Sequence, residues 1–347
     1  MIKNYNYPYN WTLKHSNFTK DKGKVFSCFA CGGGSTMGYK LAGFDVIGHN
    51  DIDKKMVDVY KENNNPKFTY LESITTFAKR KDLPKELYEL DILDGSPPCS
   101  SFSMAGNREK DWGKEKVFRE GQSEQVLDTL FFDFIDLAKE LQPKVVIAEN
   151  VKGLLLGNAK EYVRKIYKEF EEAGYYCQHF LLDASKMGVP QRRERVFFIC
   201  LRKNLSDKFL YQQDMFTVKP KIQIEFNKEK ITINDIDAEY GQELKGFALQ
   251  ELERYKSKKP FKYLQSCIVK KNQVFPTLTT GYRTKASPLI EDSNKWLNDK
   301  DICKIGSFPQ DYNFLKLSAA YLIGMSVPPV MTAQIASQVY DQWLNKL

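Results

Sequence analysis

A cysteine that follows two prolines is the first residue in this chain whose surroundings suggest chemistry. The run Gly95-Ser96-Pro97-Pro98-Cys99 comes directly after a short apolar stretch, residues 90–94, that is typical of a buried strand. Open α/β sheets bind their ligands beyond the carboxyl ends of the strands, so this loop falls at a ligand-binding position. A lone cysteine is more often a small buried apolar residue, so Cys99 needs suitable neighbours before it counts as a nucleophile.

An acid is expected at the same edge as Cys99. Residues 145–149 form a second apolar run, which ends on Glu149 and is followed by Asn150. If both runs are strands of one parallel sheet, their carboxyl ends lie at one edge, which brings Glu149 toward Cys99. A carboxyl group there can hold or move a proton on a substrate. The alternative is a solvated acid, or one that caps the next turn.

Guanidinium groups are expected to join these two residues. The segment Gln191-Arg192-Arg193-Glu194-Arg195 precedes a third apolar run. Side chains alternate along an extended chain, so Gln191, Arg193 and Arg195 share one face. Guanidinium groups beside a cysteine and an acid favour the thiolate and hold polar substrate atoms in a planar fork. The alternative is a solvated cluster of charges.

A glycine-rich turn, Phe29-Ala30-Cys31-Gly32-Gly33-Gly34-Ser35, follows the first apolar run and opens a helical stretch. Glycines let the backbone approach a ligand at a helix amino end, which is typical of nucleotide sites. The dinucleotide fingerprint fails because Met37 occupies its third glycine position, so an adenosine ligand other than a nicotinamide cofactor is favoured. Asp51, about 20 residues further on, is placed to bond ribose hydroxyls. The alternative is a turn with no ligand.

Cys28 and Cys31 have the spacing of a redox pair or of half a zinc site. No second pair or nearby histidine completes a metal set, and strand alternation points the two thiols to different faces. We therefore expect no metal.

The order of expected strands and helices predicts a sheet that can position these residues. From residue 24 to about residue 202, apolar runs alternate with amphipathic stretches, the pattern of a doubly wound, mostly parallel sheet. One expected helix follows a cap at Ser123 and ends before Pro143, and another covers residues 160–173 and stops at Gly174. Strands are expected at residues 25–29, 44–49, 90–94, 145–149, 176–182 and 195–201.

The pattern changes after Lys203. Residues 219–224 and 228–233 resemble short strands, and the lysine-rich stretch to residue 293 lacks long helical periodicity. Apolar residues return at helical spacing between residues 320 and 347, which predicts a terminal helix that packs on the first lobe. The expected division is a first domain at 1–204, a second at 205–293, and a return segment at 294–347.

The bulk properties describe an intracellular protein with a polyanionic partner. The net charge of +8 favours nucleic acid, because lysines and arginines that neutralise phosphates release counterions. No apolar run approaches the roughly 18 residues that cross a bilayer. The seven scattered cysteines suit a reducing compartment, so we expect a cytoplasmic protein without a membrane segment.

Taken together and in this order, the segments resemble the DNA (cytosine-5) methyltransferase family, of the bacterial or phage restriction-modification type, over almost the whole chain. The family's Phe-x-Gly-x-Gly-Gly turn resembles residues 29–34, its Pro-Cys loop Pro98-Cys99, and its Glu-Asn-Val residues 149–151. Its Gln-x-Arg-x-Arg matches residues 191–195, and its Gly-Asn-Ser-Val-Pro-Pro is similar to residues 324–329. The resemblance implies a Rossmann-like, class I S-adenosylmethionine-dependent methyltransferase α/β fold with a smaller target-recognition lobe at 205–293.

The resemblance also implies the cofactor S-adenosylmethionine. Phe29 would stack on its adenine, Ile52 would pack there, and Asp51 would hold the ribose. Ser326 and the turn glycines would hold the methionine end. The residues implied for this site are Phe29, Gly32, Gly33, Gly34, Asp51, Ile52, Ile74, Pro98, Leu130 and Ser326.

The implied reaction explains the residue types at the sheet edge. The Cys99 thiolate would add to carbon 6 of a cytosine while Glu149 acts at ring nitrogen 3, because carbon 5 alone is a poor nucleophile. Arg193 and Arg195 would steady the base and the loop, and Asn150 would orient neighbouring groups. The base must leave the duplex to be reached. Duplex DNA is the implied partner, with contacts from Ser103, Arg108, Gln191, Thr279 and Arg283.

Three positions depart from the family pattern, namely Cys31, Ser73 and Met325, and they bear on the hydrogen bonds to the cofactor. One alternative is a tRNA cytosine-5 methyltransferase of the same fold, although the second lobe lacks the Cys-Phe-Thr segment associated with that branch. Another is an inactive DNA-binding relative, although Cys99 and Glu149 are both present. We expect a monomer in the bacterial cytoplasm, associated with the nucleoid, with a cognate restriction endonuclease encoded nearby and no stable complex between them.

Overall fold

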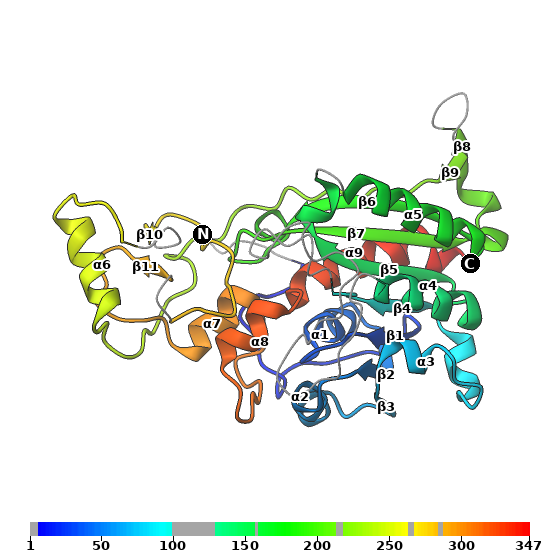
Figure 1. Cartoon of the computed structure of the whole chain (residues 1–347), viewed down its shortest axis with the longest axis horizontal. Coiled ribbons are helices and arrows are strands. Elements are labelled where there is room, and N and C mark those ends of the chain that lie inside the picture. Colours follow the sequence, from blue (N-terminus) through cyan, green and yellow to red (C-terminus); the bar gives the residue numbers. More distant parts are fainter. Residues whose placement is uncertain (1–5, 99–128, 157–158, 213–217, 263–266, 284–286) are drawn as a thin grey trace.

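The computed structural model describes residues 6–98, 129–156, 159–212, 218–262, 267–283 and 287–347. Cys99, Ser103, Arg108 and the predicted helix cap Ser123 therefore lie outside the described residues. A seven-stranded sheet with the order β3-β2-β1-β4-β5-β7-β6 forms the larger lobe (Figure 1). The strands from β3 to β5 are parallel, and β7 runs antiparallel to both β5 and β6. The bounds are β1 Lys24–Cys28, β2 Asp45–Asp51, β3 Phe68–Leu71, β4 Ile92–Gly95, β5 Val145–Val151, β6 Tyr175–Asp183 and β7 Glu194–Arg202.

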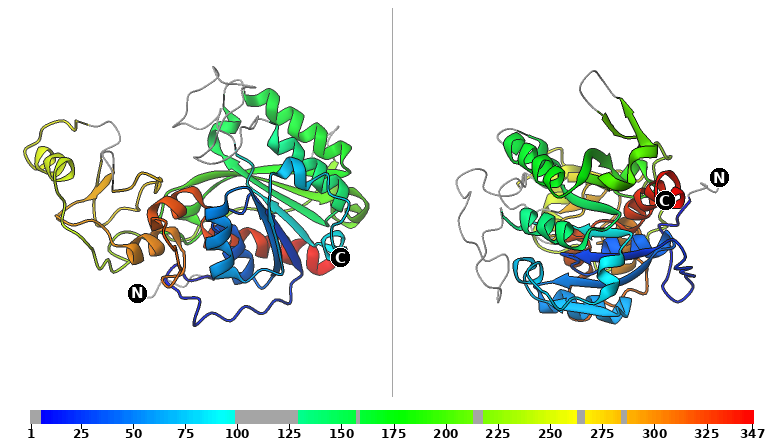
Figure 2. Two further views of the ribbon diagram at one scale, coloured as in Figure 1. Left: turned by 60° about the horizontal axis from the view of Figure 1, so that its bottom comes forward. Right: turned by 90° about the vertical axis from the view of Figure 1, so that its right-hand side faces the viewer.

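Helices cover both faces of the sheet (Figure 2), which is why the central strands are apolar on both sides. Phe26 faces one core cluster with α3, α4 and α5, and its neighbour Val25 faces the other with α1 and α9. The predicted doubly wound, mostly parallel sheet is confirmed. The helices are α1 Gly34–Leu41, α2 Lys54–Asn64, α3 Ile74–Phe77, α4 Leu130–Leu141, α5 Ala159–Glu172 and α9 Pro329–Gln342.

Several helix ends follow their local sequence. The carboxylate of Asp53 caps α2 by accepting from the backbone N–H groups of Lys55 and Met56. Helix α5 stops before Gly174, whose φ of 93° is the left-handed conformation that glycine adopts readily. Helix α4 ends at Leu141 and is followed by its cap residue Gln142, directly before Pro143. The predicted helix at residues 160–173 therefore differs from α5 by one residue at each end.

The carboxyl-terminal segment forms two helices where one was predicted. Helix α8, Ala319–Met325, ends before Ser326, and Pro329 begins α9. Proline supplies no N–H to a preceding turn but fits the first position of a new helix, so the chain breaks here. The stretch Ala319–Lys346 has the length and hydropathy of a membrane span, but 83% of its most apolar window is buried within the protein, as in a core helix.

The smaller lobe is built from short elements. It contains α6 Phe247–Lys256 and the parallel pair β10 Cys267–Val269 and β11 Pro288–Ile290, and α7 Asp299–Gly306 leads back toward α8 (Figure 1). Helix α6 was not predicted. The strand predicted at 228–233 is wrong, since these residues form no strand, and only the start of the one predicted at 219–224 is extended.

An antiparallel pair of strands, β8 Leu210–Gln212 and β9 Val218–Pro220, lies beside the larger lobe, at the opposite end of the molecule from α6 (Figure 1). Ile222 and Ile224 join the core cluster that contains α9. The Trp343 indole N–H donates to the Lys221 carbonyl at 2.9 Å. Residues 218–226 thus pack with the larger lobe, although the predicted boundary at residue 205 assigns them to the smaller one. The domain boundaries stay predictions.

Candidate active site

Three strands present their ends at one edge of the sheet. Gly95 of β4 pairs with Ala148 of β5, and Val151 of β5 pairs with Arg195 of β7. Because β7 is antiparallel, its first residues lie where β4 and β5 finish. The described chain reaches Pro98 at this edge, and Cys99 follows outside the described residues.

An ion pair between Glu149 and Arg195 forms the centre of this edge. The distance from Arg195 Nε to Glu149 Oε1 is 2.9 Å, and the two side chains are only 16% and 12% exposed. Burial lowers the pKa of Arg195, and the charge and hydrogen bond of Glu149 raise it. A second guanidinium nitrogen of Arg195 donates to the Glu194 carbonyl at 2.8 Å. The carboxylate of Glu149 is therefore held in one orientation beside the loop that leads to Cys99.

Asn150 connects β5 to that loop. Its Nδ2 donates to the Pro97 carbonyl at 3.2 Å, and its Oδ1 accepts from the Val151 N–H at 2.9 Å. The side chain is buried, so both bonds are shielded from water. Asn150 thus fixes the start of the proline loop relative to the strand that carries Glu149.

Arg193 and Gln191 lie at the junction of the two lobes. The Arg193 guanidinium is buried and donates to the carbonyls of Leu278 at 3.2 Å and Gly324 at 3.0 Å. The Gln191 side chain is 1% exposed, accepts from the Leu278 N–H at 2.9 Å and donates to the Ile305 carbonyl at 3.4 Å. These contacts link the lobes. They give Gln191 a structural position inside the protein, which argues against the predicted contact with DNA.

Helix α8 and the residues that follow it pack tightly against the glycine turn. A Cβ added at Gly32 would lie 2.4 Å from Leu322 Cδ1, and one at Gly34 would lie 2.5 Å from the Val327 carbonyl oxygen and 2.8 Å from Ser326 Cβ. The close approach that glycine permits is used here by α8 and the segment after it. Ser326, predicted at the cofactor site, is brought beside the turn from the far end of the chain.

Asp51 is held at the mouth of the same turn. Its carboxylate accepts from the N–H of Cys31 at 2.7 Å and from the N–H of Asp53 at 2.8 Å. Phe29 begins the turn with a φ of 51°. The centroid of its ring lies 6.4 Å from the centroid of the Phe134 ring. Both Phe29 and Asp51 are half-buried. The end of β2 thus places a carboxylate against the backbone of the turn that Phe29 begins.

The remaining predicted cofactor residues surround this place in the fold. Ile52 is half-buried, whereas Ile74 and Leu130 are buried in the core cluster against which Phe29 packs. Ser73 caps α3 by accepting from the Thr76 N–H at 3.1 Å. An aromatic ring, apolar side chains and a fixed carboxylate fit an adenosine ligand, whose base is flat and whose ribose carries hydroxyls. Among the described residues, no group of His, Cys, Asp and Glu side chains could hold a metal ion.

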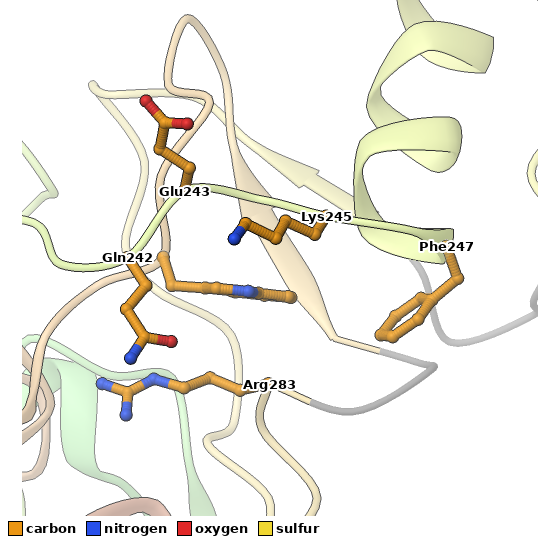
Figure 3. Close-up of a pocket in the computed structure, with 6 residues that line it drawn as sticks. Gln242, Glu243, Lys245, Phe247 and Arg283 are labelled. Atoms are coloured by element: carbon orange, nitrogen blue, oxygen red, sulfur yellow. The ribbon is translucent and has the colours of Figure 1, made fainter.

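The smaller lobe contains a pocket of about 500 Å³ near the predicted DNA contacts. Arg283 and Lys245 extend their side chains along it toward Gln242 (Figure 3). Arg283 also pairs with Asp299 at 2.9 Å and donates to the Leu297 carbonyl at 2.6 Å. Thr279 is exposed near the lobe junction. The pocket is lined by Gln242, Glu243, Lys245, Phe247, Arg283 and Trp296.

Sequence reasoning missed a buried acid beneath the turn. The sequence pattern predicts Asp94 only as the last residue of a strand, yet its carboxyl group accepts hydrogen bonds from Ser27, Ser35 and Tyr39. The available signal was an acid at the end of an otherwise apolar run. The hydroxyl of Tyr312 also donates to the Gly32 carbonyl, which no sequence pattern suggested.

Solved structures first identify the class of protein. The chain superposes on a putative DNA modification methyltransferase encoded within an Escherichia coli prophage, with a TM-score of 0.64 and 20% identity over 92% of this chain and 99% of the other. A DNMT2 mutant of Spodoptera frugiperda gives a TM-score of 0.62 at 20% identity, over 92% of this chain and 98% of the other. At these identities the likeness shows the fold, which is that of solved methyltransferases.

Sequence comparison then gives the family. The profile of the C-5 cytosine-specific DNA methylases matches residues 23–341, and this chain belongs to that family. The family predicted from the motifs is confirmed. The chain is 37% identical to the type II methyltransferase M.FnuDI of Fusobacterium nucleatum over 183 residues, 53% of this chain and 48% of that protein. It is 35% identical to M.NgoPII of Neisseria gonorrhoeae over 213 residues, 61% and 55% of the two chains.

These alignments with M.FnuDI and M.NgoPII span about half the length of each relative. A longer alignment joins the chain to the type II methyltransferase M.Bsp6I of a Bacillus species, at 26% identity over 92% of this chain and 99% of that protein.

Proposed function

We propose that this protein transfers the methyl group of S-adenosylmethionine to carbon 5 of a cytosine in a short, specific sequence of duplex DNA. The observation that supports this most directly is the buried pair of Glu149 and Arg195, at the sheet edge from which the Cys99 loop leaves. The names of the relatives, which are type II methyltransferases, agree with this activity.

Cys99 would provide the nucleophile. Its thiolate forms a bond to carbon 6 of the flipped cytosine, and the electron pair of the 5,6 double bond moves so that carbon 5 can attack an electrophile. Glu149 stabilises the ring at nitrogen 3 by holding a proton there, and Arg195 keeps the carboxyl group in place. After methylation, carbon 5 loses its proton to a base, the double bond re-forms, and the thiolate leaves carbon 6. The enzyme is regenerated.

The glycine turn and its neighbours would hold S-adenosylmethionine, whose sulfonium supplies the methyl group. Phe29 and Ile52 provide surfaces for the adenine, and Asp51 lies at the end of β2 where a ribose would meet a carboxylate. Ser326 is packed against Gly34, so the methionine end would lie where α8 meets the turn. Ile74, Leu130 and Pro98 complete the proposed set.

Duplex DNA is the proposed partner. The net charge of +8 favours a polyanion, and the target base must leave the stack to reach a residue at the sheet edge. Arg193 holds the two lobes together while the base enters, through its hydrogen bond to the Leu278 carbonyl. Asn150 holds the proline loop against β5, through its hydrogen bond to the Pro97 carbonyl. Ser103, Arg108, Thr279 and Arg283 are the proposed DNA contacts. We further propose a monomer in the bacterial cytoplasm, at the nucleoid, with a restriction endonuclease encoded nearby.

Expression in a methylation-free host, followed by base-resolution mapping of 5-methylcytosine, tests the activity and finds the target together. We expect methylated cytosines at one short sequence, and none with Cys99→Ser. Transfer of a radiolabelled methyl group to tRNA but not to duplex DNA would favour the tRNA alternative. Failure to label either substrate would favour the inactive DNA-binding relative.

A further inference from the structure

A buried carboxyl group lies beneath the glycine turn, and the proposed reaction makes no use of it. Asp94 belongs to β4, is 4% exposed, and directly precedes Gly95, from which the chain continues into the proline loop. A buried carboxylate needs several hydrogen-bond donors or a cation to offset its lost hydration. The hydrogen-bond donors to Asp94 therefore show which parts of the fold this carboxyl group connects.

Three hydroxyl groups donate to this carboxyl group. Oδ2 accepts from Ser27 Oγ at 2.7 Å and from Ser35 Oγ at 2.8 Å, and Oδ1 accepts from the Tyr39 hydroxyl at 3.1 Å. Ser27 lies opposite Asp94 in the pairing of β1 with β4. Ser35 and Tyr39 belong to α1, which begins at Gly34. One carboxyl group thus joins the strand before the turn, the helix after it, and the strand that leads to Cys99.

The hydrogen bonds suit the ionised form of Asp94. A carboxylate accepts from all three hydroxyls at once, whereas a carboxylic acid must donate its own proton and displaces at least one of them. Burial raises the pKa of Asp94 to about 6, the three hydroxyls oppose this shift, and the nearby charge of Glu149 adds to it. The arrangement is thus complete at neutral pH and is lost as the pH falls through about 6.

The thiol and phenol groups that face Asp94 do not change state in this range. Cys28, Tyr39 and Tyr60 also feel its charge, and burial raises the pKa of each of them. They stay protonated from about pH 5 to about pH 8, because their ordinary pKa values already lie above this interval. Among these groups, Asp94 alone titrates in that interval.

We propose that ionised Asp94 is a positioning residue, which fixes the glycine turn relative to the start of the proline loop, residues 96–98, and thereby sets the affinity for S-adenosylmethionine. The inference rests on the proposed function, because the turn is taken to bind that cofactor. Asp94 acts through its hydrogen bond with Ser35 at the start of α1, and the proposal gives it no step in the reaction itself.

Calorimetric titration of the full chain with S-adenosylmethionine, at several pH values from about 5 to about 8, tests this directly. We expect the Kd of the wild type to rise as the pH falls through about 6. We expect Asp94→Asn to bind about tenfold more weakly at the upper pH, which corresponds to the loss of about one pKa unit of interaction, and to show no further loss on acidification. Ser35→Ala removes one of three donors, so it should weaken binding less and keep the pH dependence.

Asp301→Asn is the matched control. Asp301 is a fully buried carboxylate in α7 that accepts from the N–H groups of Glu239, Tyr240 and Asn298, away from the turn. This variant should lose stability in thermal unfolding yet keep the wild-type pH dependence of cofactor binding.

Two results separate the inference from the proposed function. If the wild type binds and Asp94→Asn has the same affinity and the same pH dependence, the inference about Asp94 is wrong and the proposed function stands. If the wild type does not bind S-adenosylmethionine at any pH, the proposed function fails and the inference fails with it. Should Asp94→Asn not fold, the Ser27→Ala, Ser35→Ala double variant replaces it, and wild-type affinity in that variant would contradict the inference.

Discussion

The sheet edge of the larger lobe and the pocket of the smaller lobe differ in how firmly their side chains are held. Glu149 and Asn150 lie on a strand with hydrogen-bonded neighbours on both sides, and the partners of their side chains are largely shielded from solvent. Arg283 lies outside the short strands of the smaller lobe, and its partner Asp299 is 61% exposed. The groups proposed for chemistry thus lie where packing fixes their geometry, whereas those proposed for recognition lie where side chains can change at little cost.

The largest effect is expected from Glu149→Gln. The variant removes the acid and leaves Arg195 buried without its carboxylate, so turnover should fall by about a hundredfold to ten-thousandfold. The loss of one partner of a buried pair should also lower the free energy of unfolding by about 3 kcal/mol. Single-turnover methylation and urea unfolding measure the two effects.

Glu194→Gln provides the control for that change. Glu194 pairs with Lys152 at 2.9 Å, but both side chains are more than 40% exposed. An exposed pair contributes about 0–1 kcal/mol, so turnover should stay near that of the wild type. Equal losses in the two variants would show that the burial of the Glu149 pair has no special role.

An intermediate effect is expected from Gly34→Ala. The added Cβ would lie 2.5 Å from the Val327 carbonyl oxygen, and backbone atoms cannot yield as a flexible side chain can. We expect a loss of about 1–3 kcal/mol in stability and weaker binding of S-adenosylmethionine. Gly174→Ala is the control, because that glycine has a φ of 93° with open space around it. Its strain should cost about 1 kcal/mol and leave cofactor binding unchanged.

The smallest effect is expected in the smaller lobe. Arg283→Ala should weaken DNA binding by about tenfold and leave turnover at saturating DNA unchanged, because neither Glu149 nor Arg195 lines the pocket that contains Arg283. Arg164→Ala, which removes an exposed guanidinium from α5, should leave DNA binding as in the wild type. A fall in turnover with unaltered DNA affinity in Arg283→Ala would contradict the contrast between the lobes.

Much of the larger lobe could be predicted because its central strands are buried on both faces. Such strands read as continuous apolar runs, as Val145–Val151 does. The edge strand β3, with its half-buried residues, gives no such run and was missed. Helix α6 was missed because its few buried residues stand among charged ones. Short strands in the smaller lobe depend on distant partners, which local sequence does not specify.

The sequence motifs predict which residues belong to the candidate site, but they do not predict which side chains contact one another there. The motifs indicated Glu149 and Arg195, but their pairing requires that β7 run antiparallel to β5, a matter of sheet topology. Gln191 follows the motif, yet it is buried between the lobes. The burial of Ser326 against Gly34 depends on the return of the carboxyl-terminal segment, which joins parts of the chain far apart in sequence.

The central claim is that Cys99 forms a covalent bond to cytosine, and trapping on DNA tests it most directly. With 5-fluorocytosine at the target position, the proton that must leave carbon 5 is replaced by fluorine, so the thiolate cannot depart after methyl transfer. We predict a protein–DNA adduct, stable in a denaturing gel, that forms with the wild type only when S-adenosylmethionine is present. We predict no adduct with Cys99→Ser. An adduct in that variant, or active wild-type protein that gives none, would contradict the account.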